Sequence, residues 1–175
     1  MQTKNTTAAN TVSSPGSIEE LKEMLQSFDT AMFTTVTPMG LLRARPMAIQ
    51  EPTSELACDF WFVTSLDSPK TGEIAHDHQV GVSCFRSRDR AYLSISAIAR
   101  VHRDPERIAR LFKPAWRFWF PEGPHDPTIA LIEMQVERGE YWSPEGGPVR
   151  LLYEMVKSLV AGESATANIT PPKKV

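Results

Sequence analysis

The segment from Thr64 to Lys70 carries residue types that bind a phosphate group. Hydroxyls stand at Thr64, Ser65 and Ser68, ahead of the ammonium group of Lys70. Ser68 and Pro69 are typical of a helix start, where free backbone amides and the helix dipole attract anions. The segment therefore predicts a phosphate cradle, although an ordinary helix cap with a solvated lysine has the same pattern.

Two further cations, Arg43 and Arg45, lie two positions apart in a predicted strand. Side chains at i and i+2 of a strand share a face, and the guanidinium fork suits phosphate. Pro46 lacks an amide donor, which favours an edge strand or a bulge. The pair is therefore either a phosphate-binding face or a solvent-facing pair on an edge.

Trp142 lies at the end of the last long predicted strand, and Gly146 and Gly147 follow it in a turn. An indole there can face a planar ring, or it can close one end of a barrel. The aromatic run at 116–120 is likewise either a substrate lid or part of a core or subunit interface, and aromatic enrichment favours the interface.

His76 and His78 would share a metal ion only if their side chains faced each other. They fall at the end of a predicted helix, where residues i and i+2 do not. No Cys, His and Asp cluster has zinc spacing. We expect no metal site.

Apolar periodicity and turn residues place these segments on short helices and about six strands. The predicted helices cover 18–27, 69–77, 105–111 and 148–160, and the predicted strands cover 31–37, 43–50, 57–64, 79–85, 91–101 and 128–142. Most connections are too short for parallel crossovers, so the sheet should be antiparallel. Closing it into a barrel removes exposed edges. We expect a mainly β (α+β) fold.

Composition fits one globular domain. The chain has 175 residues, of which 41% are hydrophobic and 23% charged, with a formal net charge of −2. Without a basic footprint we expect no nucleic-acid partner, and without a long apolar run we expect no membrane association. Polar composition predicts disorder at 1–15 and 162–175, leaving a domain at 16–161. Cys58 and Cys84 are expected to be free thiols in a reducing cytoplasm, with a pair on neighbouring strands left open.

Three segments in this order carry a resemblance to a known family. They are Arg45-Pro46-Met47, then Phe62-Val63-Thr64 with Ser68 and Lys70 behind it, then Glu140-Tyr141-Trp142 with its glycine-rich turn. From the first helix to Arg150 the chain resembles the pyridoxamine 5′-phosphate oxidase-like family of FMN-binding split barrels, and within it the general stress protein branch. The resemblance implies a six-stranded antiparallel split β-barrel with short peripheral helices and a homodimer with FMN at the subunit interface.

The resemblance also implies residue roles. Arg45 would reach the FMN phosphate or ribityl chain, Met47 the isoalloxazine edge through its backbone, and Ser68 and Lys70 the phosphate. Val63 and Thr64 would line the flavin, while Trp142 would come from the partner subunit. The full set of predicted cofactor-binding residues is Arg45, Pro46, Met47, Val63, Thr64, Ser65, Ser68, Lys70 and Trp142. No catalytic residue is assigned.

The chain departs from the true oxidases at two places. Pro69 replaces an arginine of their phosphate loop, and Leu152 replaces the histidine of their substrate-binding Arg-Leu-His run. We therefore expect an FMN-binding protein that acts as a flavin-dependent oxidoreductase on an unknown substrate, without pyridoxamine phosphate oxidase activity. The alternative is a stress protein that binds or sequesters FMN or FAD without turnover. FAD or a deazaflavin in place of FMN also stays open.

Overall fold

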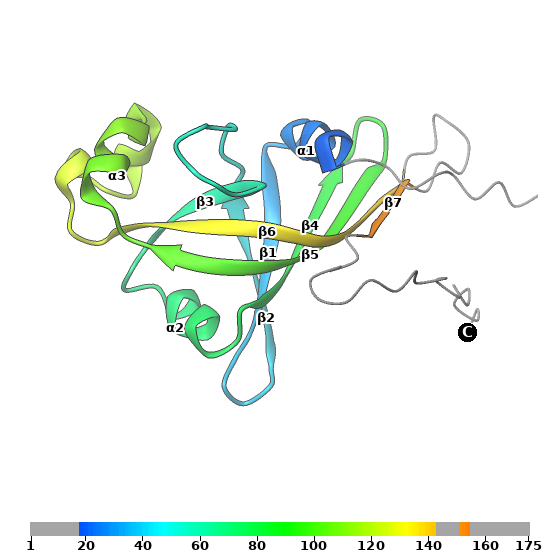
Figure 1. The fold of residues 1–175 in the computed structure, drawn as a ribbon, viewed down its shortest axis with the longest axis horizontal. Coiled ribbons are helices and arrows are strands. Elements are labelled where there is room, and N and C mark those ends of the chain that lie inside the picture. Colours follow the sequence, from blue (N-terminus) through cyan, green and yellow to red (C-terminus); the bar gives the residue numbers. More distant parts are fainter. Residues whose placement is uncertain (1–17, 143–150, 155–175) are drawn as a thin grey trace, which may run out of the picture.

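The computed structural model describes residues 18–142 and 151–154, which form one sheet flanked by short helices (Figure 1). The strands are β1 (Thr30–Val36), β2 (Leu42–Ala48), β3 (Phe60–Ser65), β4 (Gln79–Arg86), β5 (Ala91–His102), β6 (Ile129–Trp142) and β7 (Leu151–Glu154). The helices are α1 (Ile18–Gln26), α2 (Pro69–His76) and α3 (Pro105–Leu111), and two 3-10 turns are η1 (Pro114–Phe118) and η2 (Gly123–His125).

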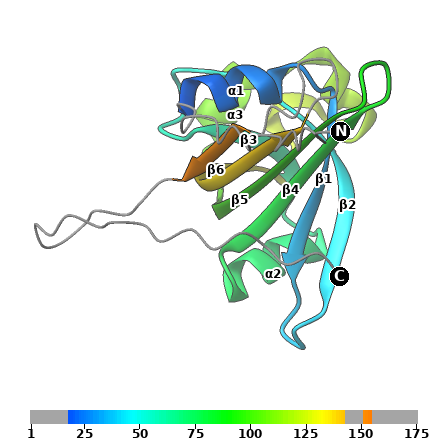
Figure 2. The same ribbon diagram turned by 90° about the vertical axis from the view of Figure 1, so that its right-hand side faces the viewer.

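The sheet is antiparallel throughout and curls on itself (Figure 2). Its strand order is β2-β1-β4-β5-β6-β3, and β7 pairs with β6. A bulge between Ser96 and Ala97 interrupts the register of β5 and β6, and bulges bend a strand. No ladder joins β2 to β3 among the described strands, so the barrel is split there. The predicted mainly β split barrel is thus confirmed, and Pro46 does lie on an edge strand.

Strand β3 separates two hydrophobic clusters, which is why its sequence is apolar on both faces. Phe60 and Phe62 face the main core, together with Phe33 of β1 and Leu21 and Leu25 of α1. On the other face Trp61 belongs to a second cluster with Ile108, Trp116, Phe120, Ile129 and Leu131. This second cluster packs α3 and η1 against the sheet, while the main core fills the curled sheet beneath α1.

The aromatic run at 116–120 is divided between core and surface. Trp116 and Phe120 are buried in the second cluster, whereas Phe118 and Trp119 are 80% and 74% exposed. The Trp116 indole donates to Gln50 Oε1 at 3.2 Å, which satisfies its buried N–H. The expected subunit interface is therefore wrong for Trp116 and Phe120, because these two rings complete the chain's own core.

The predicted helix at 148–160 is wrong where the structure describes it. Residues 151–154 form β7, which pairs with β6 from Arg138↔Glu154 to Tyr141↔Leu151. A short apolar run does not distinguish helix from strand, and the free edge of β6 offers a ladder to pair with. The rest of this range, and the tails at 1–15 and 162–175 predicted to be disordered, lie outside the described residues.

Within the described part of the chain, no helix is long and apolar enough to cross a bilayer.

Candidate functional site

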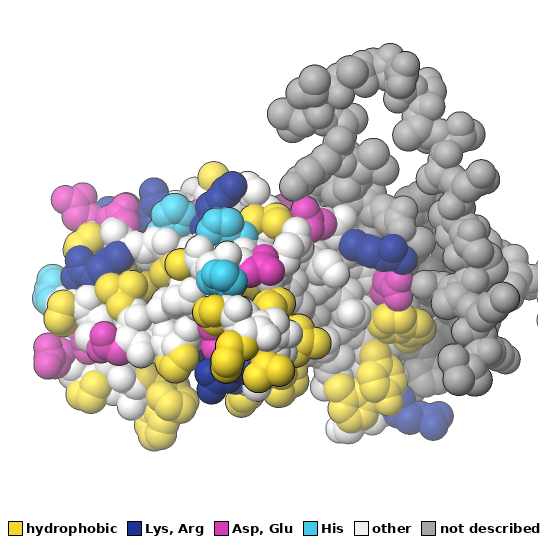
Figure 3. All heavy atoms as spheres, turned by 90° about the horizontal axis from the view of Figure 1, so that it is seen from below, with side chains coloured by type: hydrophobic (Ala, Val, Ile, Leu, Met, Phe, Trp, Pro, Cys, Tyr) yellow, Lys and Arg dark blue, Asp and Glu magenta, His cyan; other side chains and the backbone are white. Residues whose placement is uncertain are grey.

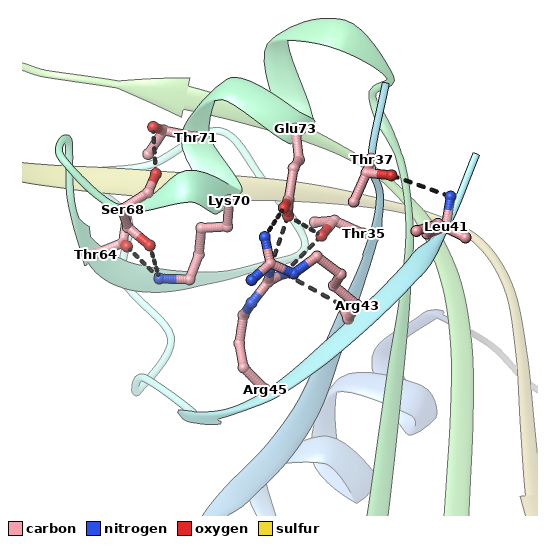
Figure 4. A network of polar contacts seen from close by, with 10 residues as sticks. All are labelled: Thr35, Thr37, Leu41, Arg43, Arg45, Thr64, Ser68, Lys70, Thr71 and Glu73. Carbon is pink, nitrogen blue, oxygen red and sulfur yellow. Dashed lines mark hydrogen bonds and ion pairs between the residues drawn. The ribbon is translucent and has the colours of Figure 1, made fainter. Parts of the chain in front are cut away.

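The start of α2 forms the polar corner that the sequence predicted (Figure 4). Ser68 is the N-cap and Pro69 the first helical residue, but the Ser68 side chain makes no capping bond. Its hydroxyl accepts a hydrogen bond from Lys70 Nζ at 2.6 Å, and the same ammonium donates to Thr64 Oγ1 at 2.9 Å. The end of β3 and the first turn of α2 thereby hold the Lys70 ammonium group between two hydroxyls.

The turn that connects β3 to α2 is fixed by its own side chains. The Thr71 hydroxyl donates to the carbonyls of Leu66 and Ser68, both at 2.8 Å. The Ser65 hydroxyl accepts from the Asp67 amide at 3.2 Å. Ser65 therefore shapes the turn and is not among the hydroxyls that hold Lys70.

Arg43 and Arg45 share a face of β2, as their spacing predicts, and both reach α2. Arg45 Nη2 lies 2.7 Å from Glu73 Oε2, and Arg43 Nη1 lies 3.0 Å from Glu73 Oε1. Arg45 Nη1 also donates to Thr35 Oγ1 of β1 at 2.6 Å. The two arginines are thus not a pair that faces solvent alone, because a carboxylate of α2 holds both.

Glu73 and Thr35 were missed by sequence reasoning, although both are central to this cluster. Glu73 is 4% exposed and Thr35 is fully buried, and the Thr35 hydroxyl donates to Glu73 Oε2. Burial pushes the pKa of Glu73 up, but hydrogen bonds from Thr35 and Arg45 and the charges of both arginines outweigh burial and hold that pKa below its ordinary value. One signal was available, because Glu73 follows Lys70 by three residues and so shares its helix face.

The cluster has a net positive charge that suits a phosphate monoester. Burial lowers the pKa of Lys70, the charge of Arg45 lowers it further, and the charge of Glu73 acts in the opposite direction. With Lys70 protonated, three cations face one carboxylate, which leaves two positive charges. A phosphate monoester carries nearly two negative charges at neutral pH. The donors and their net charge therefore fit a phosphate monoester.

The other predicted residues of β2 and β3 lie around this corner. Met47 is half-buried and packs against the main core, and Pro46 is exposed on the edge strand beside it. Val63 is half-buried against the second cluster, and Thr64 is buried at the end of β3. Of these four residues, Thr64 contacts Lys70, whose ammonium group donates to its hydroxyl.

Trp142 is not brought to this corner within one chain. Thr64 faces Ala130 near the start of β6, whereas Trp142 ends that strand. There Trp142 pairs in register with Tyr92, and Tyr92 pairs with Phe85. Phe85 and Tyr92 stack with ring centroids 4.7 Å apart. Together Phe85, Tyr92 and Trp142, which we name the aromatic row, are 55%, 48% and 39% exposed.

Further hydrophobic side chains are exposed at the tip of the β1–β2 hairpin, where Met39, Leu41 and Leu42 project. The face seen in Figure 3 carries hydrophobic side chains grouped at more than one place among basic and acidic ones. Exposed apolar groups of this kind mark interaction surfaces.

Thiol and metal chemistry have little support in the described residues. Cys58 and Cys84 are both free. Burial raises the pKa of Cys58 to about 11 and that of Cys84 to about 12, so neither is a thiolate at neutral pH. No three His, Cys, Asp or Glu side chains of this part of the chain come together as a metal site.

The split barrel and its cationic corner define a small α+β protein with a candidate phosphate-binding site. Residues 16–166 match the family described as pyridoxamine 5′-phosphate oxidase like, and the chain belongs to this family.

Individual relatives share no more than about a quarter of their residues with this chain in the three comparisons that follow. The protein bli-3 of Neurospora crassa is 24% identical over 160 residues, which cover 86% of this chain and 76% of bli-3. A Clostridium acetobutylicum protein related to general stress protein 26 aligns with a TM-score of 0.64 at 15% identity, over 79% of this chain and 94% of that one. The general stress FMN/FAD binding protein of Xanthomonas citri aligns with a TM-score of 0.60 at 24% identity, over 86% and 96%. The structural matches establish the same fold.

Proposed function

We propose that this chain binds FMN, with the phosphate at the corner formed by Lys70, Ser68, Thr64 and Arg45. The observation that carries the proposal is the cluster of three cations and one buried carboxylate at the start of α2. Membership of the family and the Xanthomonas citri relative's name as an FMN/FAD binding protein support a flavin as the phosphate-bearing ligand.

The test of this function is direct. Protein purified without added cofactor should carry the flavin absorbance bands, and the mass of the released molecule should distinguish FMN from FAD or a deazaflavin. Stripped protein should quench the fluorescence of added FMN to saturation. A colourless protein that does not respond to FMN in titration would contradict the proposal.

We further propose that the protein works as a homodimer and that Trp142 of one subunit reaches the flavin held by the other. The support is the exposed aromatic row, because rings of this size on an open sheet face favour burial in an interface. Light scattering should give the mass of two chains, and a monomer would remove Trp142 from the site. The cytoplasmic location expected from the sequence stays a prediction.

The proposed activity is flavin-dependent oxidoreduction. Bound FMN would supply hydride acceptor and donor chemistry, while the protein positions the ring. The described residues around Lys70 bind and orient, and none is assigned as an acid or base. If NADH or NADPH reduces the bound flavin at a useful rate, the oxidoreductase role is supported.

A binding or sequestering role without turnover is the second candidate, and the loss of histidine at Leu152 favours it. Flavin that stays oxidised with both nicotinamide donors would support this role. Pyridoxamine phosphate oxidase activity itself is expected to be absent, since Pro69 replaces a residue of the phosphate loop of those oxidases and Leu152 replaces one of their substrate-binding residues. An assay for pyridoxal phosphate formation tests this expectation.

A further inference from the structure

Glu73 is a buried carboxylate among the cations that are proposed to bind the phosphate of FMN. It lies on α2 with 4% of its surface exposed, and its two oxygens serve different cations. Oε1 accepts from Arg43 at 3.0 Å, and Oε2 accepts from Arg45 at 2.7 Å. A buried carboxylate must be paired to be tolerated, so Glu73 fastens the edge strand β2 to α2.

Arg45 is held more completely than Arg43. Its Nη2 is bound by Glu73, while its Nη1 donates to Thr35 at 2.6 Å and to the Arg43 carbonyl at 3.2 Å. The Thr35 hydroxyl in turn donates to Glu73, so Thr35, Arg45 and Glu73 form a closed triangle of hydrogen bonds. The side chain of Arg43, by contrast, is 55% exposed. The geometry therefore fixes the guanidinium of Arg45 before any ligand arrives, which reduces the ordering cost of binding.

We propose that Glu73 is a positioning residue for phosphate binding, which holds the Arg45 guanidinium beside Lys70. This inference rests on the proposed FMN function and names a residue that acts through Arg45 without touching the ligand. The direction in which FMN affinity changes when Glu73 is removed distinguishes this role from a simple effect of charge. Coulomb's law alone says that removing a negative charge from a phosphate site strengthens binding, whereas loss of a positioning residue weakens it.

The experiment is an FMN titration, followed by flavin fluorescence, of the stripped full-length wild type and Glu73→Gln. The amide keeps the size of the side chain and one acceptor oxygen, but its NH2 group faces a guanidinium. We expect the FMN dissociation constant to rise about 10-fold, which is about 1.4 kcal/mol. An unchanged or lower dissociation constant overturns the positioning role and leaves the proposed function standing. Absence of FMN binding in the wild type overturns both.

A rescue variant separates positioning from charge. The amide introduced by Glu73→Gln has one acceptor oxygen for two arginines, so Arg43→Gln in the same chain releases that oxygen to Arg45. Glu73→Gln/Arg43→Gln should therefore bind FMN more tightly than Glu73→Gln, although it has lost a positive charge. A double variant that binds more weakly still contradicts the proposal.

Thr35→Val gives a second route if Glu73→Gln does not fold. It removes the hydroxyl that holds Arg45 Nη1 and changes no charge. We expect FMN affinity to fall several-fold, with a circular dichroism spectrum like that of the wild type. Wild-type affinity in a folded Thr35→Val protein would overturn the role of the triangle.

The pH dependence of FMN binding gives a further test, because a role of Glu73 in packing alone would not change it. The charged groups facing Lys70 are Arg45 and Glu73, and Glu73 alone of the two raises the pKa of Lys70. In Glu73→Gln that pKa falls, so Lys70 loses its proton at lower pH. The alkaline loss of FMN affinity should therefore begin at a lower pH than in the wild type. Coincident alkaline limbs would argue against the coupling of Glu73 to this site.

Discussion

Helices α1 and α2 lie near opposite ends of β4 and pack against the sheet with different kinds of side chain (Figure 1). Helix α1 buries Leu21 and Leu25 in the main core. Helix α2 buries one apolar residue, Ile74, beside the charged Glu73. The first helix closes its end of the barrel by apolar packing, and the second covers its end with a polar cluster.

Each end also has at least one arginine paired with a carboxylate, and the two ends differ in their net charge. At the α1 end Arg86 donates three hydrogen bonds to Asp89, three residues away, and its guanidinium lies 4.9 Å from the centroid of the Phe28 ring. The opposite charges of that pair balance, and Arg86 Nη1 also donates to the carbonyl and the hydroxyl of Ser27. At the α2 end the cations outnumber the single acid, and they come from different elements. A cluster whose charges balance is suited to fastening the structure, whereas one with excess positive charge is suited to an anionic ligand.

The largest expected effect is on folding, because Glu73 fastens distant elements. Glu73→Ala leaves Arg45 without its carboxylate, and we expect the free energy of unfolding to fall by about 3 kcal/mol, the lower end for a buried pair because both arginines stay partly exposed. Asp89→Ala breaks an ion pair between residues three positions apart and should cost clearly less. Urea denaturation of both variants measures the difference, and equal losses would show that the two clusters have the same structural role.

Next in size is the loss of ligand affinity at the α2 end. Lys70→Ala removes the charge-assisted hydrogen bond that we propose for the phosphate, so FMN binding should weaken by about 1–3 kcal/mol. Lys22→Ala is the matched control on α1, where Lys22 pairs with Asp59 at 3.1 Å. Fluorescence titration should show wild-type affinity for the control. Unchanged affinity in Lys70→Ala would contradict the phosphate assignment.

Two glycines, Gly139 beside α1 and Gly72 in α2, differ in the space that a methyl group would find. A Cβ on Gly139 would lie 2.7 Å from Leu21 Cδ1, in the closed contact between α1 and β6, whereas a Cβ on Gly72 of α2 meets nothing within 4 Å. Gly139→Ala should lower stability by about 1–2 kcal/mol through overpacking. Gly72→Ala should raise it by about 0.5–1 kcal/mol, because alanine favours the helix. Thermal melts that shift in the same direction would refute this contrast.

The smallest effect is the acid dependence of stability. The folded-state pKa of Glu73 lies below its ordinary value of 4.5, so its ionised form stabilises the fold at pH above about 4.5. That contribution is lost as the pH falls through the lower folded-state pKa. The stability difference between wild type and Glu73→Gln should therefore shrink in acid. If this stability difference stays constant from pH 7 to pH 3, the ionised form of Glu73 does not stabilise the fold.

Local patterns predicted most of the fold, and long-range contacts account for what they missed. Ser68 and Pro69 marked the start of α2, and Pro46 marked the edge strand, because capping and the missing amide donor are properties of single residues. The strand at 151–154 was missed because its partner is the edge of β6, which the local sequence does not reveal. Within the candidate site the positions of Arg45 and Lys70 followed from motif spacing. The roles of Glu73 and Thr35 did not, since they depend on how α2 packs against β1 and β2.

The triangle of Thr35, Arg45 and Glu73 has a consequence for the order of folding. Arg45 and Glu73 are separated by 28 positions along the chain, and closing such a loop costs entropy that only the surrounding contacts repay. The binding corner therefore does not exist in an isolated hairpin or helix, and it appears only once β1, β2 and α2 have come together. Uptake of ligand by a nascent or refolding chain would accordingly report late assembly, and would serve as a kinetic marker that this half of the barrel has reached its native topology.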